Sequence, residues 1–222
     1  MERELNREEL LRIARPILFN TEMVQAIMRE ENPKTVTRRI LKGYIPKDAI
    51  FGYTMFTPEK HISCRGTFLD GYGEKFFKLP YLKNDILYVR ETWSTHYSGN
   101  SNGRLAYCYK ADGINLKSEC MPGETNRWYP SIHMPKEAAR IFLKIRDVRV
   151  ERLRDMKLDD FLSEGVTLRL EAFNDPENAY WQARRIFESI WNNTIKKSDL
   201  MFHSWDANPY IWVVEFEYLK NI

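Results

Sequence analysis

Apolar residues recur along this chain with two different periods, which predicts helices in some stretches and strands in others. Residues 20–33 show the helical period behind a candidate N-cap at Asn20 or Thr21, and Pro33 ends the pattern. Residues 174–194 show the same period over a longer stripe, which predicts a second helix. Its apolar positions are Ala179, Tyr180, Ala183, Ile186, Phe187, Ile190 and Trp191.

Two shorter helices are predicted mainly from their end signals. Asn6 and Glu9 stand at the spacing of a capping box, which indicates a helix near the N-terminus. Gly165 follows an apolar pattern over residues 158–164, and a glycine in that place is typical of a helix C-terminus.

Three further stretches have the composition and period of strands. Residues 84–93 predict a strand that places Glu91 on the same face as apolar neighbours. Residues 139–153 predict a long strand whose apolar positions change parity at Asp147, which indicates a bulge or a sharp bend. Residues 209–219 are nearly continuously apolar and predict a closing strand.

These elements favour the α+β class. Strands and helices do not alternate as in βαβ folds, and neither a dinucleotide-binding nor a Walker glycine pattern is present, so no cofactor is expected. The pattern predicts a small, curved, mostly antiparallel sheet or barrel with helices at its ends, in a single domain over residues 1–222. Residues 94–130 are rich in Gly, Ser and Asn around one candidate hairpin and are interpreted as an insertion.

The composition narrows the class further. The chain of 222 residues is 43% hydrophobic and 14% aromatic, which is enough for a substantial core. It has no apolar run long enough to span a membrane, and its charged N-terminus lacks a signal core. Three cysteines, Cys64, Cys108 and Cys120, form no CxxC spacing, and the four histidines are scattered. We therefore expect a cytoplasmic protein without disulfides or a metal site.

Charge is concentrated locally rather than overall. The net charge of +3 is too small to imply nucleic-acid binding, but residues 136–157 hold eight Lys or Arg against four Asp or Glu. The stretch PKTVTRRI at 33–40 combines three cations with two hydroxyls. Two interpretations are open for this stretch, because it is either a solvated edge strand or a segment that grips something anionic.

The order of these stretches resembles the ASCH domain family, and most of all its larger, prophage-type members. The resemblance covers about residues 15–219 and is carried by RPILF, KTVTRR, DILYVRETW and SIHMPKEAARI. It implies a PUA-like small β-barrel with flanking helices and a middle insertion. It also implies RNA or a modified nucleoside as the partner, bound in a basic pocket.

The resemblance also implies candidate site residues. The family signature, approximately GxKxxxxR, places Lys34 and Arg39 at its Lys and Arg, and Asn32 stands where the glycine usually lies. A small bacterial member of the family is an amidohydrolase that acts on acetylcytidine with a Lys, a Thr and a Glu. Position by position, these correspond to Lys34, Thr37 and Glu164.

Those three residue types permit amide hydrolysis. The hydroxyl of Thr37 is a weak nucleophile that needs an adjacent base, and a partly desolvated Lys34 could accept its proton. Glu164 could orient or protonate the leaving amine, while Arg39 could hold a carbonyl or an oxyanion. Lys34 and Thr37 would diverge on a flat strand, so their convergence requires Lys34 to lie in the turn before the strand.

Other residues are candidates for ligand binding, namely Arg38, Arg39, Glu91, Trp93 and Trp128. The inward carboxylate of Glu91 needs a partner, for which Lys34, Arg38 or Arg39 could serve, and a structural ion pair explains it as well as catalysis does. Trp93, Trp128 and their aromatic neighbours could stack a base, although covering the core is the favoured interpretation for most of them. Those neighbours are Tyr107, Tyr109 and Tyr129. His133 could touch the pocket or bond a nearby carbonyl, and the second is the favoured interpretation.

Three functions remain open from the sequence. The first is binding of RNA or a modified nucleoside, and the second is deacylation of acetylcytidine-type nucleosides. The third is a ribonuclease, because some ASCH relatives cut single-stranded RNA, but no His pair or carboxylate cluster supports that chemistry. The oligomeric state is open.

Overall fold

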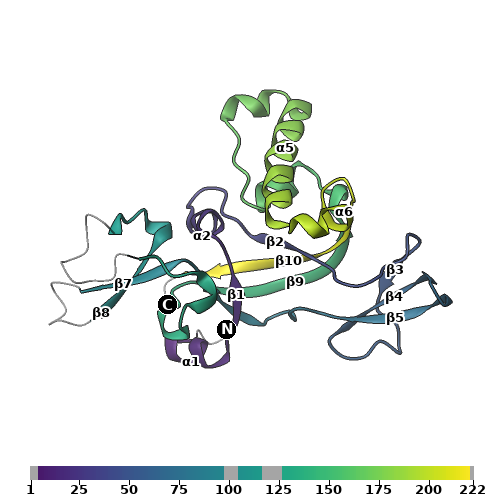
Figure 1. The fold of residues 1–222 in the computed structure, drawn as a ribbon, viewed down its shortest axis with the longest axis horizontal. Coiled ribbons are helices and arrows are strands. Elements are labelled where there is room, and N and C mark those ends of the chain that lie inside the picture. The colour runs from purple at the N-terminus through teal and green to yellow at the C-terminus, as the bar shows by residue number, and fades with distance from the viewer. Residues whose placement is uncertain (1–4, 98–104, 117–126, 221–222) are drawn as a thin grey trace. The chain divides into compact units, whose positions relative to one another are not determined.

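The computed structural model describes residues 5–97, 105–116 and 127–220 (Figure 1). Contacts divide the chain into two compact units, and each is described by itself. Unit 1 comprises Met1–Thr35, Asp85–Lys144 and Glu217–Ile222, and unit 2 comprises Val36–Asn84 and Ile145–Phe216.

The described strands form three open sheets, in the orders β1-β6-β9-β10-β2, β3-β4-β5 and β7-β8. The strands are β1 (Arg15–Leu18), β2 (Val36–Ile40), β3 (Ile50–Gly52), β4 (His61–Phe68), β5 (Gly71–Lys78), β6 (Ile86–Arg90), β7 (Trp93–Tyr97), β8 (Leu105–Tyr109), β9 (Phe142–Arg152) and β10 (Tyr210–Leu219). The predicted α+β class is confirmed. A closed barrel is not formed by these strands, because every sheet among them keeps two edge strands.

The helices of unit 1 begin where their caps predict. Asn6 forms a complete capping box with Glu9 at the start of α1 (Arg7–Ile13), and the Asn20 side chain accepts from the Met23 amide, 2.8 Å away, at the start of α2 (Thr21–Met28). The predicted end of α2 at Pro33 is wrong. A proline prevents a helix from continuing but does not require one to reach it, and the chain leaves the helix at Arg29.

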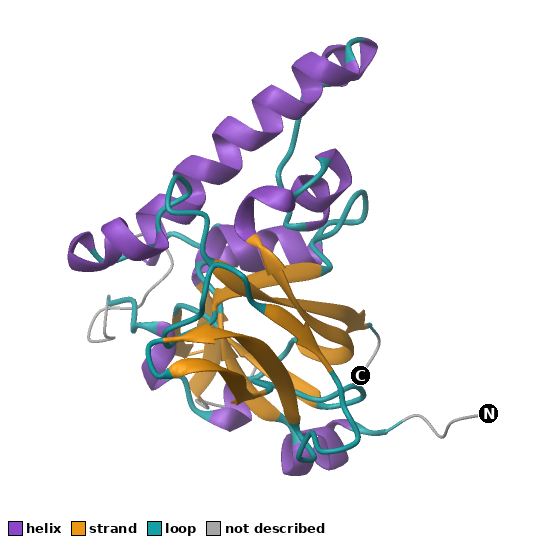
Figure 2. Ribbon diagram, turned by 90° about the vertical axis from the view of Figure 1, so that its right-hand side faces the viewer, coloured by secondary structure: helices purple, strands orange, loops and turns teal. Residues whose placement is uncertain are grey.

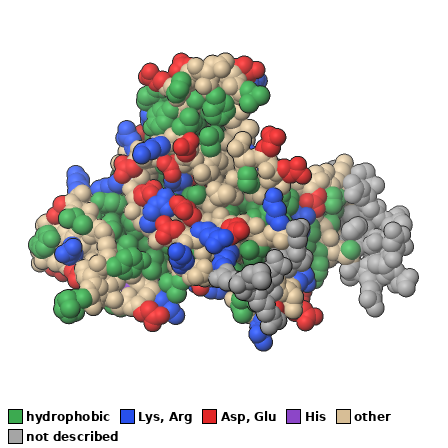
Figure 3. Space-filling view, turned by 180° about the vertical axis from the view of Figure 1, so that it is seen from behind, with side chains coloured by type: hydrophobic (Ala, Val, Ile, Leu, Met, Phe, Trp, Pro, Cys, Tyr) green, Lys and Arg blue, Asp and Glu red, His purple; other side chains and the backbone are tan. Residues whose placement is uncertain are grey.

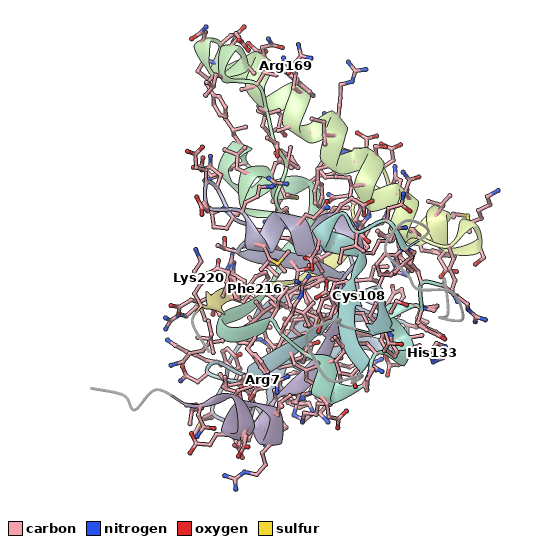
Figure 4. All side chains as sticks on the ribbon, turned by 90° about the vertical axis from the view of Figure 1, so that its left-hand side faces the viewer. Arg7, Cys108, His133, Arg169, Phe216 and Lys220 are labelled. Carbon is pink, nitrogen blue, oxygen red and sulfur yellow. The ribbon has the colours of Figure 1, made fainter. Side chains whose placement is uncertain are left out.

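A small apolar core holds unit 1 together. It joins α1, β6, the start of β9, the short 3₁₀ helix η3 (Lys136–Ala138) and Met134, which follows the 3₁₀ helix η2 (Ser131–His133). Its buried members are Leu10, Ala14, Ile86, Tyr88, Met134, Ala138, Ala139 and Phe142. Arg7 also ties α1 to this region, because its Nη2 donates to the carbonyls of Glu137 (2.7 Å) and Ala139 (3.1 Å) (Figure 4).

The insertion contains a strand pair in its described part. β7 and β8 are antiparallel, with Trp93 opposite Tyr109, so the predicted hairpin strand is present. The 3₁₀ turn η1 (Lys110–Asp112) follows β8 and ends at Gly113, where φ is 76°. The remaining residues of the insertion, 98–104 and 117–126, lie outside the described residues.

Unit 2 combines a helical layer with strands of the five-stranded sheet. The longest helix, α5 (Pro176–Thr194), lies with shorter helices beside it (Figure 2), and its cap Asp175 and first-turn Pro176 are as predicted. α4 (Leu158–Ser163) is followed by Gly165 with φ 92°, again as predicted. These helices pack on β2 and β10 through a core that includes Val36, Phe161, Leu153, Phe187, Trp191, Trp205, Ile211 and Val213.

Two predictions for unit 2 need correction. The apolar stripe of α5 is wider than its buried face, because Ile186 and Ile190 are about two-fifths exposed while Ala183 and Phe187 are buried. The β3-β4-β5 sheet is absent from the prediction altogether. The sequence feature that could have predicted this sheet is the Asp70-Gly71 pair, which is typical of a hairpin turn. A two-residue turn at 69–70 joins β4 to β5, and Gly71 takes a positive φ of 115°.

Candidate functional site

The KTVTRR segment (residues 34–39) buries an unusual amount of polar chemistry. Among the described residues, six polar or charged side chains are buried, and this one segment supplies three of them. They are Lys34, Thr37 and Arg38, and the others are Ser63, Glu91 and Ser94. The segment does form an edge strand, β2, but the alternative of a solvated edge strand is wrong for these side chains.

Lys34 lies in the connection between α2 and β2. Its backbone amide donates to the carbonyl of Ala26 on α2, 2.9 Å away, and its side chain is 1% exposed. Lysine is rarely buried to this extent unless it is paired. Asn32, two residues earlier, has a φ of 47°, which is the left-handed conformation that glycine adopts most easily. Lys34 therefore lies before the strand, as the predicted convergence with Thr37 requires.

The boundary between the units separates the predicted site residues. Thr37, Arg38, Arg39 and Glu164 belong to unit 2. The other predicted residues, Lys34, Glu91, Trp93 and Trp128, belong to unit 1.

Arg38 is the centre of a carboxylate cluster in unit 2. Its side chain is 0% exposed, and its Nη2 lies 2.7 Å from Asp160 Oδ1 and 3.8 Å from Glu151 Oε2. Its Nη1 lies 3.4 Å from Glu164 Oε1, at the C-cap of α4. Three carboxylates thus compensate one buried guanidinium. This arrangement makes Arg38 a structural residue and weakens its predicted role in ligand binding.

Thr37 and Arg39 lie on the other face of β2. Because side chains alternate along a strand, Arg38 shares its face with Val36 and Ile40, which pack against the helical core. Burial lowers the pKa of the Arg39 guanidinium, and the charges of Tyr81 and Glu164 oppose that shift. Thr37 is 1% exposed and lies opposite Val214 of β10.

Glu91 forms a second ionic cluster, in unit 1. Its partner is Arg140, whose Nε and Nη2 donate to the two carboxylate oxygens at 2.9 and 3.0 Å. Arg140 also contacts Asp112 at 2.8 Å and lies 3.9 Å from the centroid of the Tyr109 ring. The expected partners Lys34, Arg38 and Arg39 are therefore wrong. Periodicity could not reveal Arg140, because the pair joins residues that are 49 positions apart.

Burial dominates the electrostatics of this cluster. Desolvation raises the pKa of Glu91, although the hydrogen bonds and charge of Arg140 act in the opposite direction. Desolvation likewise raises the pKa of Tyr109 to about 12. Its hydroxyl donates to the carbonyl of Ala138 at 2.5 Å. The geometry is that of a satisfied structural ion pair, which was the simpler of the two interpretations of Glu91.

The aromatic candidates pack mainly on one another. The ring centroid of Trp93 lies 5.1 Å from that of Tyr129 and 5.8 Å from that of Tyr107. Trp93 and Tyr109 also pack against the core of unit 1, as the simpler interpretation expected. Trp128 is partly buried.

His133 does not make the expected bond to a carbonyl. Its side chain is exposed at the surface of unit 1 (Figure 4) and has no hydrogen bond among the described residues.

Cysteines and other potential ligands add no further site. Cys64 and Cys108 are buried and form no disulfide, and Cys120 lies outside the described residues. Within residues 5–97, 105–116 and 127–220, no group of three His, Cys, Asp or Glu side chains is placed to hold a metal ion. In the same ranges no helix has the length and apolarity that crossing a membrane requires.

No protein-family model, curated protein sequence or solved structure matches the chain.

Proposed function

We propose that the chain is an ASCH-type protein that binds RNA or a modified nucleoside through its KTVTRR segment. The observation that carries the proposal is the burial of Lys34 and Thr37, each of which is 1% exposed. Burying polar groups costs free energy unless they are paired, and clusters of perturbed groups are enriched at functional sites.

The roles within this segment follow from the two faces of β2. Arg38 is compensated by Asp160 and Glu164, so we assign it to holding the strand on the helical layer. Arg39, on the opposite face, is assigned to the ligand. A guanidinium presents a planar set of donors that suits both a phosphate and the carbonyl of a base, and it keeps its charge even when burial lowers its pKa.

The finer fold assignment, PUA-like, depends on the four motifs that resemble the ASCH family. The left-handed backbone at Asn32 supports it, because the family signature has a glycine at that position.

Binding is tested with two ligands, acetylcytidine by calorimetry and a short fluorescein-labelled RNA by anisotropy. The affinity for RNA should fall steeply between about 50 and 200 mM salt, because phosphate contacts release counterions. Arg39→Gln should weaken the binding of both ligands about tenfold or more. The matched control is Arg169→Gln, an exposed arginine beside the N-terminal end of α5 (Figure 4), which should bind as the wild type does. Wild-type protein that binds neither ligand would refute the proposal.

Amide hydrolysis is the second candidate function, favoured by the 1% exposure of both Lys34 and Thr37. Desolvation disfavours the charged form of an amine, so a larger fraction of a desolvated amine is unprotonated and able to accept a proton at neutral pH. Incubation with acetylcytidine, followed by chromatography for cytidine, measures the activity. Lys34→Met, which keeps the side chain's length without its charge, should abolish turnover. Equal turnover in wild type and variant would rule this function out.

A further inference from the structure

The β3-β4-β5 sheet of unit 2 has one face that is open to solvent and rich in aromatic and cationic side chains. Residues that are paired across an antiparallel ladder share a face, so the register identifies its members. In one row Ile50, Arg65 and Glu74 lie side by side, and Thr67 lies opposite Tyr72 in the next. On the other side, Gly52, Ser63 and Phe76 form a row, followed by His61 opposite Lys78.

We name this face the sheet platform (residues 50, 52, 61, 63, 65, 67, 72, 74, 76 and 78). Large apolar and aromatic side chains on it are unusually exposed. Tyr72 is 73% exposed, Ile50 is 61% exposed and Phe76 is 40% exposed. Arg65 and Lys78 are exposed among them. In Figure 3, hydrophobic side chains reach the surface over β3–β5, at the left of the view, with Lys and Arg atoms beside them.

The opposite face of the sheet is covered, so the two faces have different roles. Phe51 and Phe77 approach each other there with ring centroids 6.3 Å apart, and Phe51 packs on Tyr210 at 5.1 Å. The 46–49 loop also covers that face, because a Cβ at Gly66 would lie 2.8 Å from Pro46 Cγ. A Cβ at Gly52, on the platform, would meet nothing within 4 Å. The opposite face is therefore used in packing, while the platform, apart from the buried Ser63, is exposed and available to a partner.

We propose that the sheet platform binds single-stranded RNA, with Tyr72 and Phe76 stacking on bases and with Arg65 and Lys78 contacting phosphates. This inference rests on the proposed function and identifies a second contact surface for the same kind of ligand. Aromatic rings beside cations on a sheet are the combination by which single strands are bound. Tyr72 and Phe76 are four residues apart on β5, about 13 Å, which leaves room for a nucleotide between two stacked bases.

The charges favour an anionic partner. The platform and its edge carry three exposed cations, Arg65, Lys78 and Lys60, against two carboxylates, those of Glu74 on the platform and of Asp48, which accepts from the Thr67 hydroxyl. None of these three cations makes an ion pair within the described part of the chain. The edge strand β5 also carries charged residues and two glycines, Gly71 and Gly73, which disfavour addition of a protein strand to that edge.

Ser63 adds a further observation. Its side chain is 1% exposed and its Oγ lacks a hydrogen-bond partner within the described residues. A buried polar atom without a partner is rare and requires an explanation. Ser63 shares its row with Phe76 and Gly52, so its hydroxyl lies beneath the exposed surface on which the base is proposed to stack.

The test measures binding of a short labelled oligouridine by anisotropy, with acetylcytidine calorimetry in parallel. Tyr72→Ala and Phe76→Ala should each weaken oligouridine binding about 5- to 150-fold, the usual effect of losing one stacked base. Tyr72→Trp should retain binding because the ring is kept. Acetylcytidine binding should not change in any of these variants. Trp181→Ala, which removes a 46% exposed aromatic residue of α5, is the matched control and should bind oligouridine normally.

The outcomes separate this proposal from the proposed function. If Tyr72→Ala binds oligouridine as the wild type does, or if the wild type binds acetylcytidine but not oligouridine, the platform is refuted and the proposed function stands. If the wild type binds neither ligand, both fall. If Tyr72→Ala instead changes the sedimentation of the protein alone, the face is a protein–protein contact and the proposal is overturned. Because Tyr72 is mostly exposed, its variant is expected to fold, and circular dichroism checks this.

Discussion

The ionic clusters around Arg38 and Glu91 bury opposite partners. In unit 2 the cation is hidden, since the Arg38 side chain is 0% exposed, while Asp160 is 29% exposed. In unit 1 the anion is hidden, since the Glu91 side chain is 1% exposed, while Arg140 is 27% exposed. The clusters also differ in how the arginine is paired. Three carboxylates surround Arg38, whereas Arg140 donates to both carboxylate oxygens of Glu91.

This difference predicts which substitution does most damage. Removing the more exposed partner of a pair leaves the buried charge uncompensated, which costs far more than the pair itself contributes. Glu91 depends on Arg140 for both of its hydrogen bonds, whereas Arg38 retains two carboxylates when it loses one. The cluster of unit 1 should therefore be the more fragile of the two.

Arg140→Ala is expected to have the largest effect, a loss of about 3 kcal/mol in the free energy of unfolding, at the low end of the usual range because Arg140 is partly exposed. Urea unfolding followed by circular dichroism measures it. The loss should shrink as pH falls, because Arg140 opposes the rise that desolvation causes in the pKa of Glu91, and without Arg140 the buried carboxylate takes up a proton at a higher pH than in the wild type. The matched control Arg12→Ala, an exposed arginine of α1, should change stability by less than about 0.5 kcal/mol. A loss that does not depend on pH would contradict this account of Glu91.

Asp160→Asn should cost less, about 2 kcal/mol, because Glu164 and Glu151 still face Arg38. The substitution weakens the 2.7 Å contact to Nη2 and perturbs the bond that Asp160 Oδ2 accepts from the Lys157 amide at 2.9 Å. The control is Asp159→Asn on the same helix, whose side chain is exposed. If both variants unfold at the same urea concentration, Arg38 does not depend on Asp160.

Local signals in the sequence predicted more of the fold than of these clusters. The starts of α1, α2 and α5 follow from Asn6, Asn20 and Asp175, because an N-cap bonds to amides only two or three residues away. Strand β5 escaped because most of its side chains are exposed, so it has no alternation of buried and exposed positions.

The candidate site was likewise predictable only where its signal is local in the sequence. The KTVTRR segment stood out by its composition, and the structure buries Lys34 and Thr37 within it. The partners of Arg38 and Glu91 were not predictable, because ion pairs such as Arg140–Glu91 depend on which distant segments the fold brings together. Composition identifies residues that need a partner, and only the tertiary structure identifies the partner.

Tyr109→Phe is expected to cost about 1 kcal/mol, the usual net value of one hydrogen bond. The variant removes the hydrogen bond from the hydroxyl to the Ala138 carbonyl. It keeps the aromatic ring, whose centroid lies 3.9 Å from the Arg140 guanidinium. Urea unfolding measures the cost, and Tyr107→Phe, at a residue that is 40% exposed, is the control. Ultraviolet titration of the wild type should also show one tyrosine that ionises only near pH 12, and that signal should be missing in Tyr109→Phe.

Asp48 is an exposed carboxylate and so contrasts with the buried Glu91. Its substitution should therefore change the stability of the protein least. Its carboxylate accepts from the Thr67 amide at 3.0 and 3.1 Å and from the Thr67 hydroxyl at 2.8 Å, and these bonds lower its pKa. A lowered pKa means that the stabilisation is present above the usual value near 3.8 and is lost as pH falls through the folded value. This sign is opposite to that of Glu91.

Asp48→Asn should therefore unfold at a slightly lower urea concentration than wild type at neutral pH, and the difference should vanish in acid. Asp70→Asn, at a carboxylate that is 77% exposed in the turn between β4 and β5, is the control and should unfold at nearly the wild-type urea concentration at neutral pH. A difference at Asp48 that persists unchanged into acid would mean that its charge is not what Thr67 stabilises. The pH dependence of the two carboxylates then separates burial, which raises a pKa, from hydrogen bonding, which lowers it, within one protein.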